Sequence, residues 1–441
     1  VTPADLREEA KAVEAMANAK QSLKPDTSPA QIERLLRERG DMLKTPLVLW
    51  QLADELELVD RDESHCIRYE ARGNNTKDEK KDKLVLTRRK RFCVSDDVPV
   101  IFIDANASED ILKLFRSNVE LVDIPVKRQA TIHQFTDLTF SKNSLINGKD
   151  NNKLRGQVKD FIERIGRTGR TLVVATKSVS AVLQEEVVNV QPGLLSPPPI
   201  AFGHFGNLRG INDYSDFDNV VVVGREQAPA NATEDEARAL WWDSEFPVYA
   251  LPLNEGNKPL DLEYRSYRSA PPRTVAVNVH PDKRVQLLIE QSREANSEQA
   301  LDRLRLLRTP KGNARNVYLL CNIPLNVTVD MYCGWEEIQR LLALWNEADG
   351  LLPLSVSSLI ERCPTNAASE RTAKRLIADW KRANSLIISL IRDVALCAFR
   401  PSNTRVKWSQ VVVGSCLEPM LIERKLEELL NTPIELKLGD S

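Results

Sequence analysis

Residues 298–305 are the stretch in which polar side chains are built most clearly into a helical pattern of apolar positions. Three apolar residues recur there at helical spacing and can face a core, namely Ala300, Leu301 and Leu304. Gln299 and Arg303 lie four residues apart and fall together on another face of the same predicted helix. A guanidinium is a permanently charged, planar donor that matches phosphate oxygens, so this pair suits an anionic ligand. The alternative is a solvated helix face with ordinary charges.

Largely apolar runs recur along the middle of the chain and predict strands. They are Val98–Ile103, Val119–Pro125, Thr171–Lys177, Val220–Val223 and Asn316–Cys321. The first is fully apolar, which is typical of a strand buried on both faces in a parallel sheet. Helical patterns lie between them at Glu109–Phe115 and Gln157–Ile165, and another helix opens at Trp335. The alternation of the two patterns predicts an α/β lobe.

The two ends of the chain have different patterns. Residues 1 to about 60 predict helices, one of which opens with a serine cap and a proline at Ser28–Gln31. Residues 68–92 are polar, with a predicted hairpin tip at Asn74–Thr76. The cationic run Arg88–Arg91 is a candidate contact for nucleic-acid phosphates, although most such runs are only solvated.

From about residue 350 the pattern predicts a helix, a turn and a second helix, followed by a strand-like segment at Arg405–Val413. In the second helix, Leu376, Ile377 and Trp380 form an apolar stripe. Its basic residues lie on another side, as a groove-entering helix needs, and are Arg371, Lys374 and Arg375. We interpret this region as a winged-helix-like domain with residues 405–413 as the wing. The alternative is a plain helical cap with surface charge.

Composition narrows the class of protein. A chain of 441 residues is too long for one core and implies two or three domains. No apolar run approaches the roughly 20 residues that a membrane span needs, and no apolar signal region is seen at the N-terminus. Seven scattered cysteines without a CxxC pair, and only four histidines, favour the reducing cytosol and argue against a zinc site. The net charge of -2 leaves the choice of partner open.

The chain lacks the usual apparatus for gripping the β- and γ-phosphates of a nucleotide. The glycines of Gly166–Arg170 precede a strand, whereas a Walker A loop follows a strand and continues into Lys-Ser or Lys-Thr on a helix. No Gly-Lys-Thr or Gly-Lys-Ser occurs anywhere in the sequence. Small and polar residues do follow the predicted strand at Asp104–Ser108, where open α/β sheets place ligands, although a plain helix cap explains them equally well.

A second candidate is the loop Gly203–Asp213, which holds three glycines, a histidine and an arginine. Glycines let backbone amides approach phosphate oxygens closely, and Arg209 can supply charge. The alternative is a structural loop with an N-cap at Asp213. His204 taken alone is more typical of a loop hydrogen bond than of a general base.

In their order, these segments resemble the later motifs of superfamily-two helicases, and more narrowly the C-terminal part of helicase-like replication proteins of plasmids, phages and integrated elements. The resemblance covers residues 95–335 approximately. Asp104–Ala107 matches the Ser-Ala-Thr-like coupling motif, and Thr176 and Lys177 match a strand end that touches the nucleic-acid backbone. Residues 209–213, which include Gly210, Asn212 and Asp213, match the motif that links nucleotide to nucleic acid. Gln299 and Arg303 match the Gln-x-x-Gly-Arg-x-x-Arg motif, which lends an arginine finger.

The sequence departs from that family pattern in three places. Asn106 stands where threonine is expected, and Asp302 stands where the arginine motif has glycine. The second arginine is Arg305 rather than the residue after it. On a regular helix Arg303 and Arg305 point about 200° apart, so both reach one phosphate only if the helix bends or ends there. Arg303 is therefore the stronger candidate.

The resemblance implies three parts. Residues 1–95 are expected to be a helical and basic hairpin segment, from the tail or an insertion of a first lobe. Residues 96–348 are expected to form the second RecA-like lobe, and 349–441 the winged-helix-like domain. Such a motor hydrolyses ATP with Mg²⁺ between two lobes and moves along DNA or RNA. We expect this chain to supply the arginine finger and nucleic-acid contacts, including His204. A missing lobe or protein partner would carry the phosphate loop, as in a fragment or a split gene product.

Two other functions fit the same sequence. One is a non-enzymatic DNA-binding replication accessory, in which the lobe is only a scaffold. The other is a structural subunit that docks onto a complete motor. An upstream reading frame with a phosphate loop and an Asp-Glu pair would favour the split motor.

Overall fold

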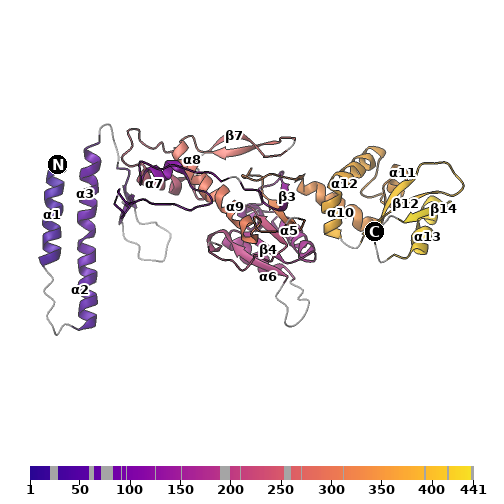
Figure 1. Ribbon diagram of the computed structural model, residues 1–441, viewed down its shortest axis with the longest axis horizontal. Coiled ribbons are helices and arrows are strands. Elements are labelled where there is room, and N and C mark those ends of the chain that lie inside the picture. Colours follow the sequence, from indigo (N-terminus) through magenta and orange to yellow (C-terminus); the bar gives the residue numbers. More distant parts are fainter. Residues whose placement is uncertain are drawn as a thin grey trace. The chain divides into compact units, whose positions relative to one another are not determined.

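The computed structural model of the protein (Figure 1) describes fifteen segments of the chain. They are residues 1–19, 28–58, 64–70, 83–90, 92–95, 97–124, 126–149, 151–188, 199–208, 210–252, 260–269, 271–310, 312–391, 394–414 and 417–438. The chain divides into two compact units. Unit 1 comprises Val1–Ile124, Gln227–Glu263 and Asn278–Ser292, and unit 2 comprises Pro125–Glu226, Tyr264–Val277 and Arg293–Ser441. The three-part division expected from the sequence stays a prediction.

Unit 1 begins with three helices, α1 (Pro3–Ala19), α2 (Pro29–Met42) and α3 (Lys44–Leu56). Helix α1 packs along α3, and α2 leads almost directly into α3 (Figure 1). The predicted cap at Ser28 is confirmed, because its hydroxyl accepts from the backbone N–H of Gln31 while the Gln31 side chain accepts from Ser28 N–H. An antiparallel hairpin follows, formed by β1 (Ile67–Glu70) and β2 (Lys83–Leu86).

The small core of unit 1 lies between α7 (Ala230–Leu240) and α8 (Lys283–Glu290), with α4 (Glu109–Lys113) against it. A buried polar contact fastens these elements, since His280 Nε2 lies 3.1 Å from Glu234 Oε1. Strands β7 (Asp261–Ser266) and β8 (Thr274–Val279) pair as a separate two-stranded sheet.

Unit 2 is built on a six-stranded sheet in which every neighbouring pair is parallel. The strand order is β10 (Met331–Cys333), β3 (Ala130–Phe135), β9 (Arg315–Leu320), β6 (Asn219–Val223), β4 (Thr171–Ala175) and β5 (Ile200–His204). All residues of β4 and β6 are buried, as the apolar runs at these positions predict. The α/β class expected from the sequence is confirmed.

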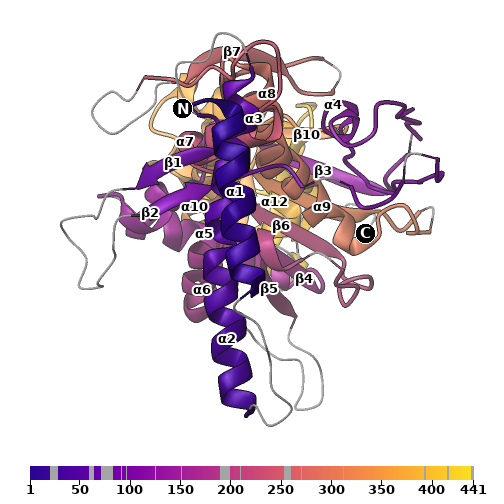
Figure 2. The same cartoon turned by 90° about the vertical axis from the view of Figure 1, so that its left-hand side faces the viewer.

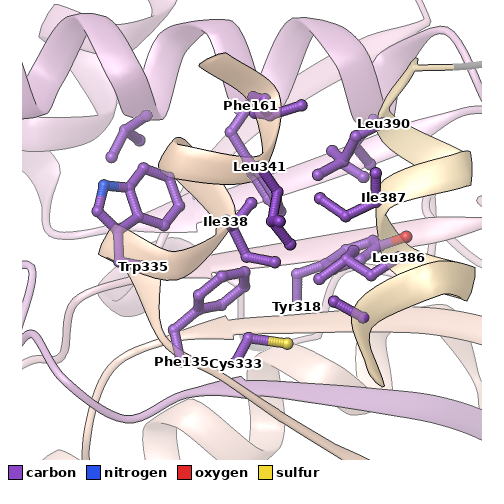
Figure 3. Packing of buried hydrophobic residues seen from close by; sticks show 14 of the residues in the cluster. Phe135, Phe161, Tyr318, Cys333, Trp335, Ile338, Leu341, Leu386, Ile387 and Leu390 are labelled. Atoms are coloured by element: carbon purple, nitrogen blue, oxygen red, sulfur yellow. The ribbon is translucent and has the colours of Figure 1, made fainter. Parts of the chain in front are cut away.

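One face of this sheet is covered by α5 (Asn151–Gly166), α6 (Lys177–Glu186), α10 (Trp335–Ala348) and α12 (Glu370–Ile391). Figure 3 shows Phe135 and Tyr318 of the strands packed against Phe161, Trp335 and the apolar side of α12. The aromatic rings meet mostly edge to face, with the centroids of Phe135 and Phe161 5.5 Å apart. Helix α12 therefore belongs to the same core as the sheet.

The opposite face is covered by α9 (Asn296–Leu301) and by the loops after β5 and β9. Phe205, Leu208 and Phe217 lie in this second core together with Ala300 and Leu301 of α9. Figure 2 shows α9 on the other side of the strands from α5 and α6. The sheet is thus buried on both faces, as parallel sheets require.

The C-terminal part continues in the order α10, β11 (Leu351–Pro353), α11 (Val356–Arg362), α12, β12 (Val394–Pro401), β13 (Ser409–Gly414), α13 (Pro419–Leu430) and β14 (Ile434–Leu438). Its strands form an antiparallel sheet of order β11, β13, β12, β14 around a core of its own. The expected helix, turn and helix are confirmed. The strand expected from Arg405 begins instead at Ser409.

Two predicted strands are wrong. Residues 98–103 and 119–124 have no strand structure, although the helix predicted between them is present as α4. Ile101 and Ile103 are 85% and 95% exposed. A strand forms only within a ladder that satisfies its backbone and covers its side chains, and in the described part of the chain nothing provides that ladder.

His133 makes the stability of unit 2 sensitive to pH. Its ring stacks on Tyr318 at 5.0 Å between centroids, and burial lowers its pKa from 6.5 to about 4. Between those values the unfolded chain binds a proton that the folded chain does not bind, so stability falls as the pH falls from 6.5 to 4. The full loss is about 3 kcal/mol.

We expect His133→Phe, which keeps an aromatic ring beside Tyr318, to flatten this part of the stability profile. Urea unfolding of both proteins between pH 7 and pH 4, followed by tryptophan fluorescence, measures the slope. A variant that loses stability as steeply as the parent protein would place the titrating group elsewhere.

Candidate functional site

The carboxyl ends of the parallel strands bring three of the expected nucleic-acid contacts together. His204 ends β5 directly beside Ala175, the last residue of β4. Thr176 and Lys177 follow Ala175 and begin α6, with Thr176 as its N-cap. The Thr176 hydroxyl is buried without a hydrogen-bond partner, whereas Lys177 is exposed. This edge therefore presents a cation and a partly exposed imidazole to solvent, with the unpartnered Thr176 hydroxyl buried behind them.

The loop after β5 packs on the sheet through its apolar residues. A Cβ at Gly203 would lie 2.8 Å from Leu208 Cδ2, so a larger residue there would require the Leu208 side chain to shift. Gly210 has a left-handed backbone with φ of +79° and open space around it. Asn212 and Asp213 are exposed, so all three expected nucleotide-linking residues are accessible. Arg209, the remaining candidate in this loop, lies outside the described residues.

The helix predicted over residues 298–305 is present only in its first half. Helix α9 ends at Leu301, Asp302–Leu304 form a single 3₁₀ turn, and Arg305 has a left-handed backbone with φ of +51°. The prediction of one continuous amphipathic helix is therefore wrong beyond Leu301. The physical cause is tertiary, because Leu304 and Leu306 are both fully buried and the chain must turn to bury them.

This turn is fixed to the start of β3 by a charged contact. Arg128 donates from Nε and Nη2 to the two carboxylate oxygens of Asp302, at 2.9 Å and 2.8 Å. The hydrogen bond to Asp302 raises the pKa of Arg128 above its ordinary value. Asp302, which departs from the family pattern, thus has a clear structural role as the acceptor that ends the helix.

Arg303 connects the two segments that the resemblance relates to nucleotide chemistry. Its Nε donates to Gln299 O at 3.2 Å, and its Nη1 donates to Ile211 O at 3.3 Å. Both distances are at the long end for hydrogen bonds, and the side chain is half-buried. Gln299 is half-buried as well. The structure thus places Arg303 against the 210–213 loop, 92 residues away in the sequence.

Two arginines near the same sheet, one half-buried and one fully buried, were not predicted from the sequence. Arg225 follows Gly224 at the end of β6 and donates to Asn322 Oδ1 at 3.1 Å. Arg293 is completely buried and forms an ion pair with Glu294 at 2.7 Å. Burial lowers the pKa of Arg225, and the charge of nearby Arg293 lowers it further. The Glu294 carboxylate compensates the charge of Arg293 and acts in the opposite direction on the pKa of Arg225.

Gly224 is the residue from which the turn at the carboxyl end of β6 could have been predicted. Its φ is +69°, and a Cβ there would lie 2.4 Å from Phe140 O, so only glycine fits after the apolar run of β6. Nothing in the sequence distinguishes Arg293 from an ordinary surface arginine.

The basic residues expected on the second C-terminal helix are exposed. Arg371, Lys374 and Arg375 of α12 face solvent, and Ala373, Leu376 and Trp380 face the core. Lys374 forms an ion pair with Glu370 one turn earlier. By contrast, Arg89 of the cationic run in unit 1 is engaged, since it donates to Leu240 O and pairs with Asp243.

Asp104–Ala107 lies in unit 1, where Asp104 accepts a hydrogen bond from Asn106 N at 2.7 Å and Ser108 caps α4. The helix-cap alternative therefore describes this segment locally. In the described part of the chain, no three metal-ligating side chains come together. Among the same residues, no helix has the length and apolar character to cross a membrane.

Comparison with known proteins assigns no family. No protein-family model matches the chain, and no curated protein or solved structure is detectably similar to it.

The left-handed backbone of Arg305 should matter more for stability than its side chain. A non-glycine residue in this conformation costs about 1 kcal/mol or more, so Arg305→Gly should leave the free energy of unfolding unchanged or raise it by up to about 1 kcal/mol. Arg305→Val should lower it by at least as much, because a β-branched residue tolerates the conformation poorly. Urea unfolding measures both. A clear loss of stability in Arg305→Gly would show that the side chain, not the backbone, holds the turn.

Proposed function

We propose that the chain is the C-terminal half of an ATP-dependent nucleic-acid helicase or translocase, in which unit 2 is a second RecA-like lobe. It supplies an arginine finger and contacts to nucleic acid, and a complementary lobe supplies the phosphate loop. The complementary lobe is either a further part of the same protein or a protein partner.

The observation that carries the proposal is the contact of Arg303 with Ile211. It joins the segment that resembles an arginine motif to the segment that resembles a nucleotide-linking motif. Since those motifs act on one nucleotide in the helicase family, the geometry supports a shared role here. Gly210, Asn212 and Asp213 are exposed beside this contact and are assigned to the nucleotide side.

A guanidinium placed against a phosphoryl group in transfer stabilises the charge that develops on its oxygens, an effect of about 10³- to 10⁵-fold on turnover in other NTPases. Arg303 can leave two long hydrogen bonds to backbone carbonyls to reach such a group. Arg305 is the weaker candidate, because its backbone conformation serves to end the helix. Mg²⁺ is assigned to the complementary lobe, since no three metal-ligating side chains gather among the described residues.

The nucleic-acid contacts are assigned to two surfaces of unit 2. The first is the sheet edge with Thr176, Lys177 and His204. The second is the exposed basic side of α12. The order of elements from β11 to β13, a short strand, two helices and then two paired antiparallel strands, supports a winged-helix-like domain in which α12 enters a groove. The free thiols of Cys321, Cys333, Cys363 and Cys397 are buried, which is compatible with a cytoplasmic protein.

The proposed role of Arg303 as an arginine finger is tested in a complex reconstituted with a phosphate-loop lobe. The chain alone should show negligible ATPase activity, because the sequence has no phosphate loop. In the complex, Arg303→Ala should lower ATP turnover by about 10³-fold or more, with thermal stability and DNA binding nearly unchanged.

Arg305→Ala is the matched control and should retain most of the turnover. If Arg305 matters more than Arg303, the alignment with the family motif is wrong by two positions. Robust ATPase activity of the chain without a partner would contradict the division of labour.

The basic side of α12 is tested by salt dependence. Removing two phosphate contacts with Arg371→Ala and Arg375→Ala should weaken DNA binding and reduce the slope of log K against log salt by about 2. The control is Arg34→Ala with Arg37→Ala, which removes two exposed arginines from α2. An equal loss of DNA affinity in both double variants would show only a general charge effect. DNA binding that does not change with salt concentration would favour a docking subunit.

A further inference from the structure

Two apolar segments of unit 1 are exposed on both of their sides. In residues 98–103, Ile101 and Ile103 are 85% and 95% exposed, while Val98 and Phe102 on the alternate side are 46% and 38% exposed. In residues 119–124, Val122 and Ile124 are both 72% exposed, and Leu121 is 46% exposed. A surface with so many large apolar side chains marks an interaction site rather than scattered exposed residues.

The two segments border one hollow. It has a volume of about 690 Å³ and is lined by residues of both segments, among them Val100, Phe102, Val119 and Leu121. Leu112 and Phe115, at the end of α4, line the same hollow. The two segments therefore face a common space that the described part of unit 1 does not fill.

Helix α4 holds this arrangement in place. Ile111 and Leu114 pack against the core formed by α7 and α8, so the helix between the two segments is anchored to unit 1. Ser108 caps its first turn. The chain thus has the order of a βαβ unit, with the helix formed and neither strand formed.

The pattern of exposure restricts what can cover these segments. A helix or a lipid surface would cover one side of an extended segment and leave its other side and its backbone groups in water. A strand buried on both faces instead needs parallel neighbours for its backbone and helices above and below it. The fitting partner is therefore an open parallel sheet within an α/β lobe.

We propose that residues 98–103 and 119–124 become strands of the parallel sheet of the complementary phosphate-loop lobe, with a strand of that lobe occupying the hollow between them. This inference rests on the proposed function, which postulates that lobe. The inference adds the surface through which the chain binds the complementary lobe. It also makes these two segments of unit 1 a structural part of that lobe.

The test uses the chain coexpressed with the complementary phosphate-loop lobe, supplied as a separate polypeptide. Ile101→Asp with Val122→Asp should weaken their association at least 100-fold. The chain alone should fold normally, because both side chains face water in it. Leu84→Asp with Leu262→Asp is the matched control, since these residues are 61% and 68% exposed outside the two segments, and it should associate as the parent does.

Hydrogen exchange separates this inference from the proposed function. Backbone amides of 98–103 and 119–124 should exchange quickly in the chain alone and at least 100-fold more slowly in the complex. A complex that hydrolyses ATP while these amides stay unprotected overturns the inference and leaves the function standing. If these amides are protected in a complex that has no ATPase activity, the proposed function is wrong and the contact between the two polypeptides stands. Failure of the two polypeptides to associate, or self-association of the chain that Ile101→Asp abolishes, also overturns the inference.

Discussion

A parallel strand must be covered on both faces, and this constraint decides which parts of the chain are ordered as a sheet. In unit 2 the requirement is met, because four helices cover one face of the six strands and α9 with the neighbouring loops covers the other. The complete burial of β4 and β6 follows from it. The functional candidates depend on the same arrangement, since the carboxyl ends of the strands and the helix α9 are positioned by the two cores on either side.

The candidate site combines fixed and movable parts. Asp302 is tied to Arg128 by two hydrogen bonds, and the left-handed Arg305 ends the turn, so the backbone around Arg303 is well defined. The Arg303 side chain, in contrast, is held only by two carbonyl oxygens at 3.2 Å and 3.3 Å. A rigid backbone with a releasable guanidinium suits a residue that acts on a ligand bound elsewhere. Under the proposed function, this arrangement would let a lobe without a phosphate loop contribute to phosphate chemistry.

The apolar patterns predicted β4, β6 and β9 correctly, because four or five consecutive apolar residues bounded by polar residues or glycine are typical of a short buried strand. The same pattern failed at residues 98–103, since it reports what environment a segment needs and not whether the rest of the described chain provides it. The end of α9 could not be predicted either, because it depends on Arg128 and on the burial of Leu304 and Leu306. Arg293 left no signal, as its burial is a property of tertiary packing alone.

The most direct measurement is a structure of the chain assembled with a phosphate-loop lobe, DNA, ADP and aluminium fluoride, which imitates the phosphoryl group in transfer. The account predicts that the Arg303 guanidinium has left the Ile211 carbonyl and lies about 3 Å from a fluoride of that group. A structure in which Arg303 still donates to Ile211, and another arginine or none approaches the fluorides, would contradict it.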